Sequence, residues 1–468
     1  MSRPVKSFSA IPTRRAALSL GLGGAAAAWL APHAAFASDQ VPPPPQRQAL
    51  IVTGATLHTV SGPVIANGRM LVERGRIRAI AAPGQALPAP ETGPATTLDL
   101  SGLHVYPGFI SAHSSMGLVE VQSVRATVDT TEIGIVNPNA RAVVALNADS
   151  ELLPVARSNG VLAALAVPSG GSFGAISGTS ALIQLDGWNW EDMALKRELG
   201  LHVSLPTMRL GADVLGGNLE PFREDIRKLS AQRLQTLAQA FDTAAAYLKA
   251  KAADPRTPHD LRWDAMAPAL RGERPVFVVA NELPQIRWAL DLAERHALKL
   301  VFGGGADAAR IAPVLKARGV PGVIGGVHEL PLRRDEGYDS RYTLAAQLAQ
   351  AGVAFCIARN GGSFAAATER NLPYEAGTAV AHGLPADEAL KAITLYPAQI
   401  LGVADQLGSL SPGRLASFIV TDGNPLETAT QVRRVFIQGR EVDAGNRQQR
   451  LERKYQQRAA NLGAAPSR

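Results

Sequence analysis

The carboxyl-terminal half of the 468-residue chain alternates short apolar runs with helical segments, and this alternation constrains the fold more than any other feature. The strand-like runs are residues 275–280, 298–302, 322–325 and 352–358, and the helical segments between them are residues 282–296, 306–317 and 340–349. Repeated β-α units of this size predict an α/β fold with a parallel sheet. In a domain of about 300 residues, the natural closure of such a sheet is a (β/α)8 barrel of the TIM type.

Shorter strand-like runs, separated by Gly, Asn and Pro, flank this region at both ends of the chain. They are residues 49–52, 68–72 and 76–80 near the amino terminus, and residues 417–420 and 432–440 near the carboxyl terminus. This spacing is typical of a small β-domain. Residues 190–270 are mostly helical by pattern and are interpreted as an insertion between barrel units.

Four motifs occur in order along the chain and resemble the amidohydrolase superfamily. Residues 98–115 resemble its D-x-x-G-x-x-V-x-P-G-(L/F)-(I/V)-D-x-H-x-H pattern, and residues 388–398 resemble its E-A-L-x-A-x-T-x-N-P-A helix. Residues 408–420 resemble G-x-L-x-x-G-K-x-A-D-L-V-V, and residues 432–442 resemble the closing strand. The resemblance covers nearly the whole mature chain and is nearest to exported members of the imidazolonepropionase and dipeptidase type.

The resemblance implies a division into domains. A small β-sandwich domain would be built from residues 48–106 together with residues 408–445. Residues 107–407 would form the barrel, with the helical insertion near 190–270. Residues 38–47 are interpreted as a linker, and residues 446–468 as a basic tail.

Enzymes of this family use one or two divalent metals to activate water, and an Asp after the eighth strand takes the proton. Barrel enzymes carry such groups at the carboxyl ends of their strands. At the corresponding ends this chain has His113 followed by Ser115, then Asn281, Gly303–Gly305 and Arg359. A serine hydroxyl is a poor ligand for a metal that prefers imidazole, and a cation would oppose a divalent ion. Most expected ligand positions are therefore substituted, and no cofactor is predicted firmly, although zinc or another divalent metal stays open.

His113 is interpreted either as a lone metal ligand or, more readily, as a hydrogen-bonded pocket histidine. The other pocket candidates near the strand ends are Ser115, Asn281, His328, Arg359 and Asn360. Asn281 equally suits the start of a helix, and His328 equally suits an ordinary loop.

The segment from residue 118 to 151 is rich in polar groups and adds four pocket candidates: Glu120, Arg125, Asp129 and Glu132. Long loops at a barrel mouth commonly bind ligands. An equally weighted alternative is a solvated lid held by its own salt bridges.

The first 37 residues have the layout of a twin-arginine signal peptide: the pair Arg14–Arg15, a mildly apolar stretch, and Ala35-Phe36-Ala37 as a cleavage site. We therefore expect an exported, periplasmic protein. The formal net charge is +7, and four basic residues lie in the signal, so the remaining surplus is too small to predict a nucleic-acid partner. Cys356 is the single cysteine and lies in an apolar run, which predicts burial without a nucleophilic role.

The basic tail predicts a solvated terminal helix. A membrane-surface role is the less favoured interpretation of this helix, because no strong apolar face accompanies its charges. No second apolar run of the mature chain is long enough to cross a bilayer.

Two functions follow from these observations. The first is a hydrolase of small amide or peptide C–N bonds whose metal-dependent activity is weakened or lost. The second is a catalytically silent barrel that acts as a periplasmic binding or scaffolding protein. A metal-free hydrolase that uses the acidic residues of the 118–151 segment is a weaker third hypothesis. In each case the expected partner is a small molecule in the barrel mouth, and a homo-oligomer stays open.

Overall fold

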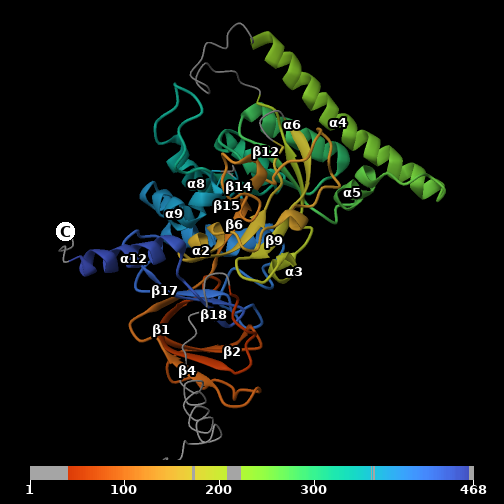
Figure 1. The fold of residues 1–468 in the computed structure, drawn as a ribbon. Coiled ribbons are helices and arrows are strands. Elements are labelled where there is room, and N and C mark those ends of the chain that lie inside the picture. Colours follow the sequence, from red (N-terminus) through yellow and green to blue (C-terminus); the bar gives the residue numbers. More distant parts are fainter. Residues whose placement is uncertain (1–40, 171–173, 208–222, 360, 362–363, 463–468) are drawn as a thin grey trace, which may run out of the picture. The chain divides into compact units, whose positions relative to one another are not determined.

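The computed structural model describes residues 41–170, 174–207, 223–359, 361 and 364–462 (Figure 1). Segments from both ends of this part of the chain form one eight-stranded sheet. Its strand order is β18-β17-β16-β5-β1-β2-β3, and β4 pairs with β1. The strands are β1 (Leu50–His58), β2 (Val64–Glu73), β3 (Arg76–Ala81), β4 (Thr96–Asp99), β5 (His104–Pro107), β16 (Phe418–Thr421), β17 (Val432–Ile437) and β18 (Arg440–Val442).

Antiparallel pairing of β16 with β5 joins the two ends of the chain in this sheet. Burial alternates at the start of β3, where Ile77 is buried between the exposed Arg76 and Arg78, whereas all four residues of β16 are buried. Phe418 stacks on Phe436 with ring centroids 4.5 Å apart, and both rings are buried with Leu57 and Met70 in the same core cluster.

The central region is an α/β assembly with two hydrogen-bonded sheets. One has the order β10-β9-β7-β6 and the other the order β15-β14-β13-β12-β11-β8. The strands are β6 (Phe109–Ser114), β7 (Val161–Ala166), β8 (Ala175–Thr179), β9 (Ala181–Gln184), β10 (Ala194–Lys196), β11 (Leu201–Ser204), β12 (Val276–Ala280), β13 (Leu300–Gly304), β14 (Gly322–Gly325) and β15 (Phe355–Ala358). Strands β11 to β15 are parallel, and β15 lies beside β6. The carboxyl ends of these strands therefore open on the same side.

Helices and short turns of helix connect the strands. They are α2 (Leu152–Arg157), α3 (Trp190–Met193), α4 (Arg223–Ala253), α5 (Leu261–Leu270), α6 (Leu283–His296), α7 (Ala312–Ala317), α8 (Ser340–Ala351), α9 (Leu372–Ala381), α10 (Ala386–Ala392), α11 (Leu395–Ile400) and α12 (Arg447–Asn461), with 3-10 turns η1 (Arg125–Thr127), η2 (Ala142–Ala145), η4 (Ala308–Ile311) and η5 (Ala366–Asn371). Within the described residues, no helix combines the length and the apolarity that a bilayer crossing requires.

Helix α6 shows why the β-α alternation was readable from the sequence. Glu282 and Gln285 form a capping box at its start, and a proline occupies its first turn. Ile286, Ala289 and Leu290 recur at helical spacing and are buried against the sheet. The predicted alternation from residue 275 to 358 is confirmed, with boundaries shifted by a few residues.

The predicted helical insertion differs from the structure in its first part. Residues 194–204 contain β10 and β11, and the long helices α4 and α5 begin only afterwards. The run Leu199 to Leu205 alternates apolar residues with Gly, His and Ser, which is the period of a strand. This short strand pattern lies within residues 190–270, which are mostly helical by pattern.

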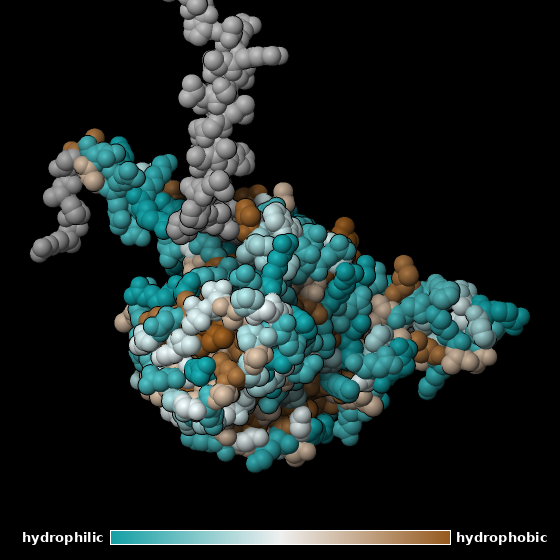
Figure 2. All heavy atoms as spheres, turned by 90° about the horizontal axis from the view of Figure 1, so that it is seen from below, coloured by the Kyte–Doolittle hydropathy of each residue, from teal (hydrophilic) through white to brown (hydrophobic). Residues whose placement is uncertain are grey.

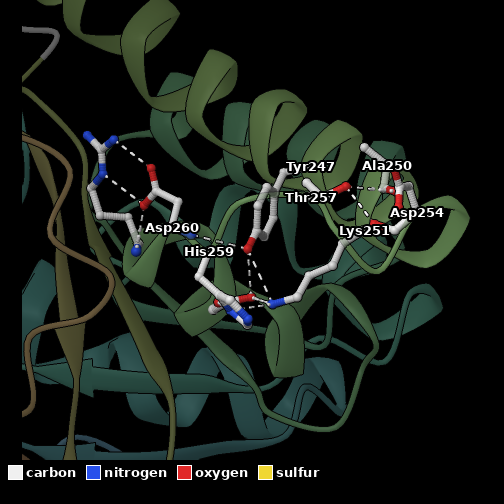
Figure 3. Close-up of polar contacts among 9 residues, drawn as sticks. Tyr247, Ala250, Lys251, Asp254, Thr257, His259 and Asp260 are labelled. Atoms are coloured by element: carbon white, nitrogen blue, oxygen red, sulfur yellow. Dashed lines mark hydrogen bonds and ion pairs between the residues drawn. The ribbon is translucent and has the colours of Figure 1, made fainter.

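Helices α4 and α5 pack together as a hairpin, and a polar network lies beside the loop that connects them (Figure 3). Lys251 of α4 donates to the Asp264 carboxylate of α5, and the Tyr247 hydroxyl donates to the same carboxylate at 3.0 Å. These hydrogen bonds lower the pKa of Asp264 to about 2. On the other side of α4, Leu237, Ala240 and Phe241 are buried, so this helix packs as predicted.

Candidate functional site

His113 lies at the end of β6, where neighbouring strand ends meet. A Cβ atom added to Gly361 would lie 2.4 Å from its Nε2, and one added to Gly303 would lie 3.8 Å from its Nδ1. The glycine backbone after β15 therefore packs directly on the imidazole edge, and β13 faces the other ring nitrogen. Burial lowers the pKa of His113 to about 4. The imidazole is consequently neutral at neutral pH.

His202 is a second histidine of this site, and the sequence interpretation did not include it. It lies on β11, with its ring centroid 6.1 Å from that of His113, and it stacks on Phe277 at 4.7 Å. Its side chain is 2% exposed, and neither ring nitrogen has a hydrogen-bond partner among the described residues. Burial, followed by the neighbouring His113, moves its pKa well below the ordinary value. The period-two run that predicts β11 is the signal by which it could have been found.

Glu369 is a third group that sequence reasoning missed. It lies in η5 and is completely buried. Burial raises its pKa to about 7, although the hydroxyls of Ser114 and Ser111 and the charge of Arg359 oppose that shift. Neither carboxylate oxygen of Glu369 has a well-aligned hydrogen-bond donor among the described residues. Because its pKa is raised, this carboxyl group retains its proton to higher pH than an exposed one, and in the protonated form it can donate a hydrogen bond.

Arg359, at the end of β15, is paired with a buried acid. Its guanidinium donates to Oε1 of Glu375, which is fully buried in α9, and to Oγ1 of Thr368 at 2.9 Å. Arg359 was expected to oppose a divalent ion as a cation, and in the structure its charge is paired with that of Glu375. The backbone N–H of His328 also donates to Glu375, at 3.0 Å, and the His328 Nε2 lies 2.7 Å from Oγ1 of Thr378. His328 thus belongs to this polar cluster.

Ser115, Asn281 and Asn360 are the remaining strand-end candidates. Ser115 is completely buried. Asn281 packs against Gly304, where an added Cβ would lie 2.3 Å from Asn281 Oδ1, and the following Glu282 caps α6. Asn360 lies outside the described residues.

The four candidates of the 118–151 segment make the contacts of a surface loop. Arg125, Asp129 and Glu132 are exposed. Arg125 donates to the Val128 carbonyl at 2.7 Å, and Glu120 accepts from Asn147 at 3.3 Å, so the contacts of both remain within their own segment. No ion pair joins these four residues in the part of the chain that the structure describes. Neither the pocket-lining role nor the salt-bridged lid is supported by these contacts.

The residues present do not fit the divalent metal that the family resemblance implies. In the described ranges, no three or more His, Cys, Asp and Glu side chains are grouped so that they could hold a metal ion. The Gly361 backbone packs against the Nε2 edge of His113, and the end of β13 contributes only glycines. A zinc site needs about three protein ligands around an open position.

Substituting His202 with phenylalanine is expected to raise the free energy of unfolding by about 1 kcal/mol. The exchange removes two buried nitrogens without partners and preserves the stacking on Phe277. Urea unfolding followed by circular dichroism measures the effect. His202→Ala is the control and should destabilise, because it leaves a cavity. An equal loss of stability in both variants would show that the imidazole nitrogens have partners in the native protein.

Comparison with known proteins places this geometry in context. The model of the amidohydrolase family matches residues 307–442. An amidohydrolase structure from Thermotoga maritima is similar with a TM-score of 0.72 and 25% identity, and the match covers 84% of this chain and 99% of the other. The structure of a molinate hydrolase is similar in fold alone, with a TM-score of 0.50 and 14% identity over 85% of this chain and 95% of the other.

A curated relative is the amidohydrolase tasK of Hapsidospora irregularis. It is 24% identical over 403 residues, which are 80% of this chain. The chain spans only 39% of the length of that relative.

Proposed function

We propose that the chain, which is similar to amidohydrolases in sequence and fold, is a member of that superfamily with weakened or lost metal-dependent hydrolysis of C–N bonds, and that its strand-end site binds a small uncharged molecule. The observation that carries this proposal is the pairing of Arg359 with the buried Glu375 at the end of β15. The resemblance expects an Asp there that accepts a proton. A guanidinium stays protonated at neutral pH and cannot take that role.

The charges around the site favour an uncharged ligand. His113 and His202 are neutral at neutral pH because burial lowers both pKa values. Arg359 is balanced by Glu375, and the pKa of Glu369 is close to 7. An anionic molecule would lose its hydration here without gaining an unpaired positive charge. A neutral polar molecule could instead pair with the free nitrogens of His202 and with the Glu369 carboxyl group.

The proposal includes the architecture expected from the sequence, a (β/α)8 barrel with a β-sandwich domain built from both ends of the chain. The adjacency of β15 and β6 supports closure of the barrel, since these would be its last and first strands. The ligand would then lie at the mouth formed by the carboxyl ends of the strands, where barrel proteins bind small molecules.

Elemental analysis of the protein, purified without chelator, is expected to find far less than one equivalent of transition metal per chain. Ser115→His is expected to remain inactive toward small amides and dipeptides, since one restored ligand does not complete a site that needs about three. The measurement combines elemental analysis with a hydrolysis assay in added zinc. Stoichiometric metal in the unmodified protein, or zinc-dependent hydrolysis by the variant, would contradict the loss of metal chemistry.

Thermal-shift screening distinguishes binding from a purely scaffolding role. Small neutral amides are expected to raise the melting temperature, whereas carboxylic acids of similar size are not. The matched control is His202→Phe, which preserves the ring stacking and removes the two nitrogens. A shift that persists unchanged in this variant would place the ligand elsewhere.

A further inference from the structure

Helix α12 projects from the rest of the described chain and is the arm at the left of both Figure 1 and Figure 2. Asn446 begins it with a capping box that includes Gln449, and none of its residues is buried. Only its first turns are attached. Asn446 donates to Ser158 at 3.0 Å, and Arg450 lies 3.6 Å from Glu151. An exposed helix of 15 residues is marginal in water without packing, so a partner surface would stabilise it.

The helix carries a strong excess of positive charge. Its basic residues are Arg447, Arg450, Arg453, Lys454 and Arg458, and its single acid is Glu452. Apart from Arg450, these basic residues make no ion pair within the described residues. Glu452 instead accepts a hydrogen bond from Gln456 at 3.0 Å. The positive charge of the helix is therefore largely uncompensated, which favours an anionic surface as its partner.

An apolar stripe runs beside these charges. Leu451, Tyr455 and Ala459 are four residues apart and share one face of the helix, and Leu462 follows on the same face. Leu451 is 40%, Tyr455 56% and Leu462 71% exposed. The sequence interpretation had expected no strong apolar face here. The structure shows that Leu451, Tyr455 and Leu462 are exposed, and by their spacing Arg447 and Arg458 share this face of the helix.

We propose that α12 binds the surface of an anionic lipid bilayer, with its apolar stripe in the interface and its basic side chains against the headgroups. Helices that lie in a membrane interface combine such a stripe with Lys and Arg on the polar face and have low net hydrophobicity. A nucleic acid or an acidic protein would use the charges but would not require the aligned apolar residues. This proposal does not depend on the ligand proposed for the strand-end site.

Vesicle co-sedimentation of the full chain tests the proposal. With vesicles of phosphatidylcholine and phosphatidylglycerol we expect roughly tenfold more bound protein than with phosphatidylcholine alone, and a steep decrease at high salt. Two double variants separate the contributions: Arg453→Gln with Lys454→Gln, and Leu451→Ser with Tyr455→Ser. Both are expected to reduce binding at least several-fold. All four side chains are on a helix without buried residues, so the fold should be preserved, which circular dichroism checks.

The matched control is Arg227→Gln with Lys228→Gln on α4, which removes the same charge from side chains that are 70% and 71% exposed. This control is expected to bind like the unmodified protein. Equal losses in the control and the α12 charge variant would overturn the proposal in favour of general electrostatic attraction. Full binding by the Leu451 and Tyr455 variant would overturn it in favour of a purely ionic partner, and absence of binding to anionic vesicles would also overturn it.

Discussion

Glu375→Gln is expected to lower the free energy of unfolding by about 3 kcal/mol. Glutamine has nearly the same shape as glutamate, but it carries no charge and so leaves the guanidinium of Arg359 without its anion. The Arg359 side chain is only 19% exposed. It also weakens the hydrogen bond that the His328 backbone donates to the carboxylate. Because Arg359 retains some contact with water, the effect should lie at the lower end of that typical of buried ion pairs.

Urea unfolding followed by circular dichroism measures this loss. The double variant Arg359→Met with Glu375→Leu is the control and should recover most of it, since removing both charges leaves no unpaired ion. If Glu375→Gln is as stable as the unmodified protein, the ion pair does not organise the end of β15, and the main support for lost metal chemistry disappears.

Between pH 7 and pH 4, His113 alone is expected to contribute a loss of up to about 3 kcal/mol of stability. Its pKa is lowered from 6.5 to about 4 in the folded protein. Between pH 6.5 and pH 4 the unfolded chain therefore binds a proton at His113 that the folded chain does not bind. The stability that the neutral imidazole contributes is complete above pH 6.5 and is lost as the pH decreases toward 4. His202, whose pKa is also lowered, acts in the same direction.

Glu369 acts in the opposite direction and provides a control. Its pKa is raised from 4.5 to about 7, so the folded protein holds a proton that the unfolded chain releases between these values. Its contribution to stability is complete below pH 4.5 and is lost as the pH increases through 7. Glu369→Gln should therefore steepen the loss between pH 7 and 4, and His113→Gln should flatten it. Parallel pH profiles for the two variants and the unmodified protein would show that neither group is perturbed by burial.

Much of the fold was predictable because local patterns report on local structure. Strands β12 to β15 and helices α6 to α8 lie where the apolar periods placed them, since each period records which side chains face the core. The solvated helix at residues 447–461 was similarly predictable from its charge and from the Asn446 cap. The short strand β11 was missed because it lies within residues 190–270, which are mostly helical by pattern.

The sequence by itself determined which residues occupy the strand ends. Asn281, the glycines after residue 302 and Arg359 could be placed there because each follows an apolar run in a repeating β-α unit, and Ser115 because residues 98–115 resemble the family motif. Their identities already argued against a complete set of metal ligands.

Only the tertiary structure decided what these residues contact. The pairing of Arg359 with Glu375, the position of His202 beside His113, and the burial of Glu369 each depend on how separate elements pack. A periodic pattern shows which face of an element a side chain lies on, but it does not show which residues that side chain contacts. Contacts between distant segments are set by the packing of the whole domain. Whether Arg359 would oppose a metal or neutralise a buried acid was therefore decided by the fold alone.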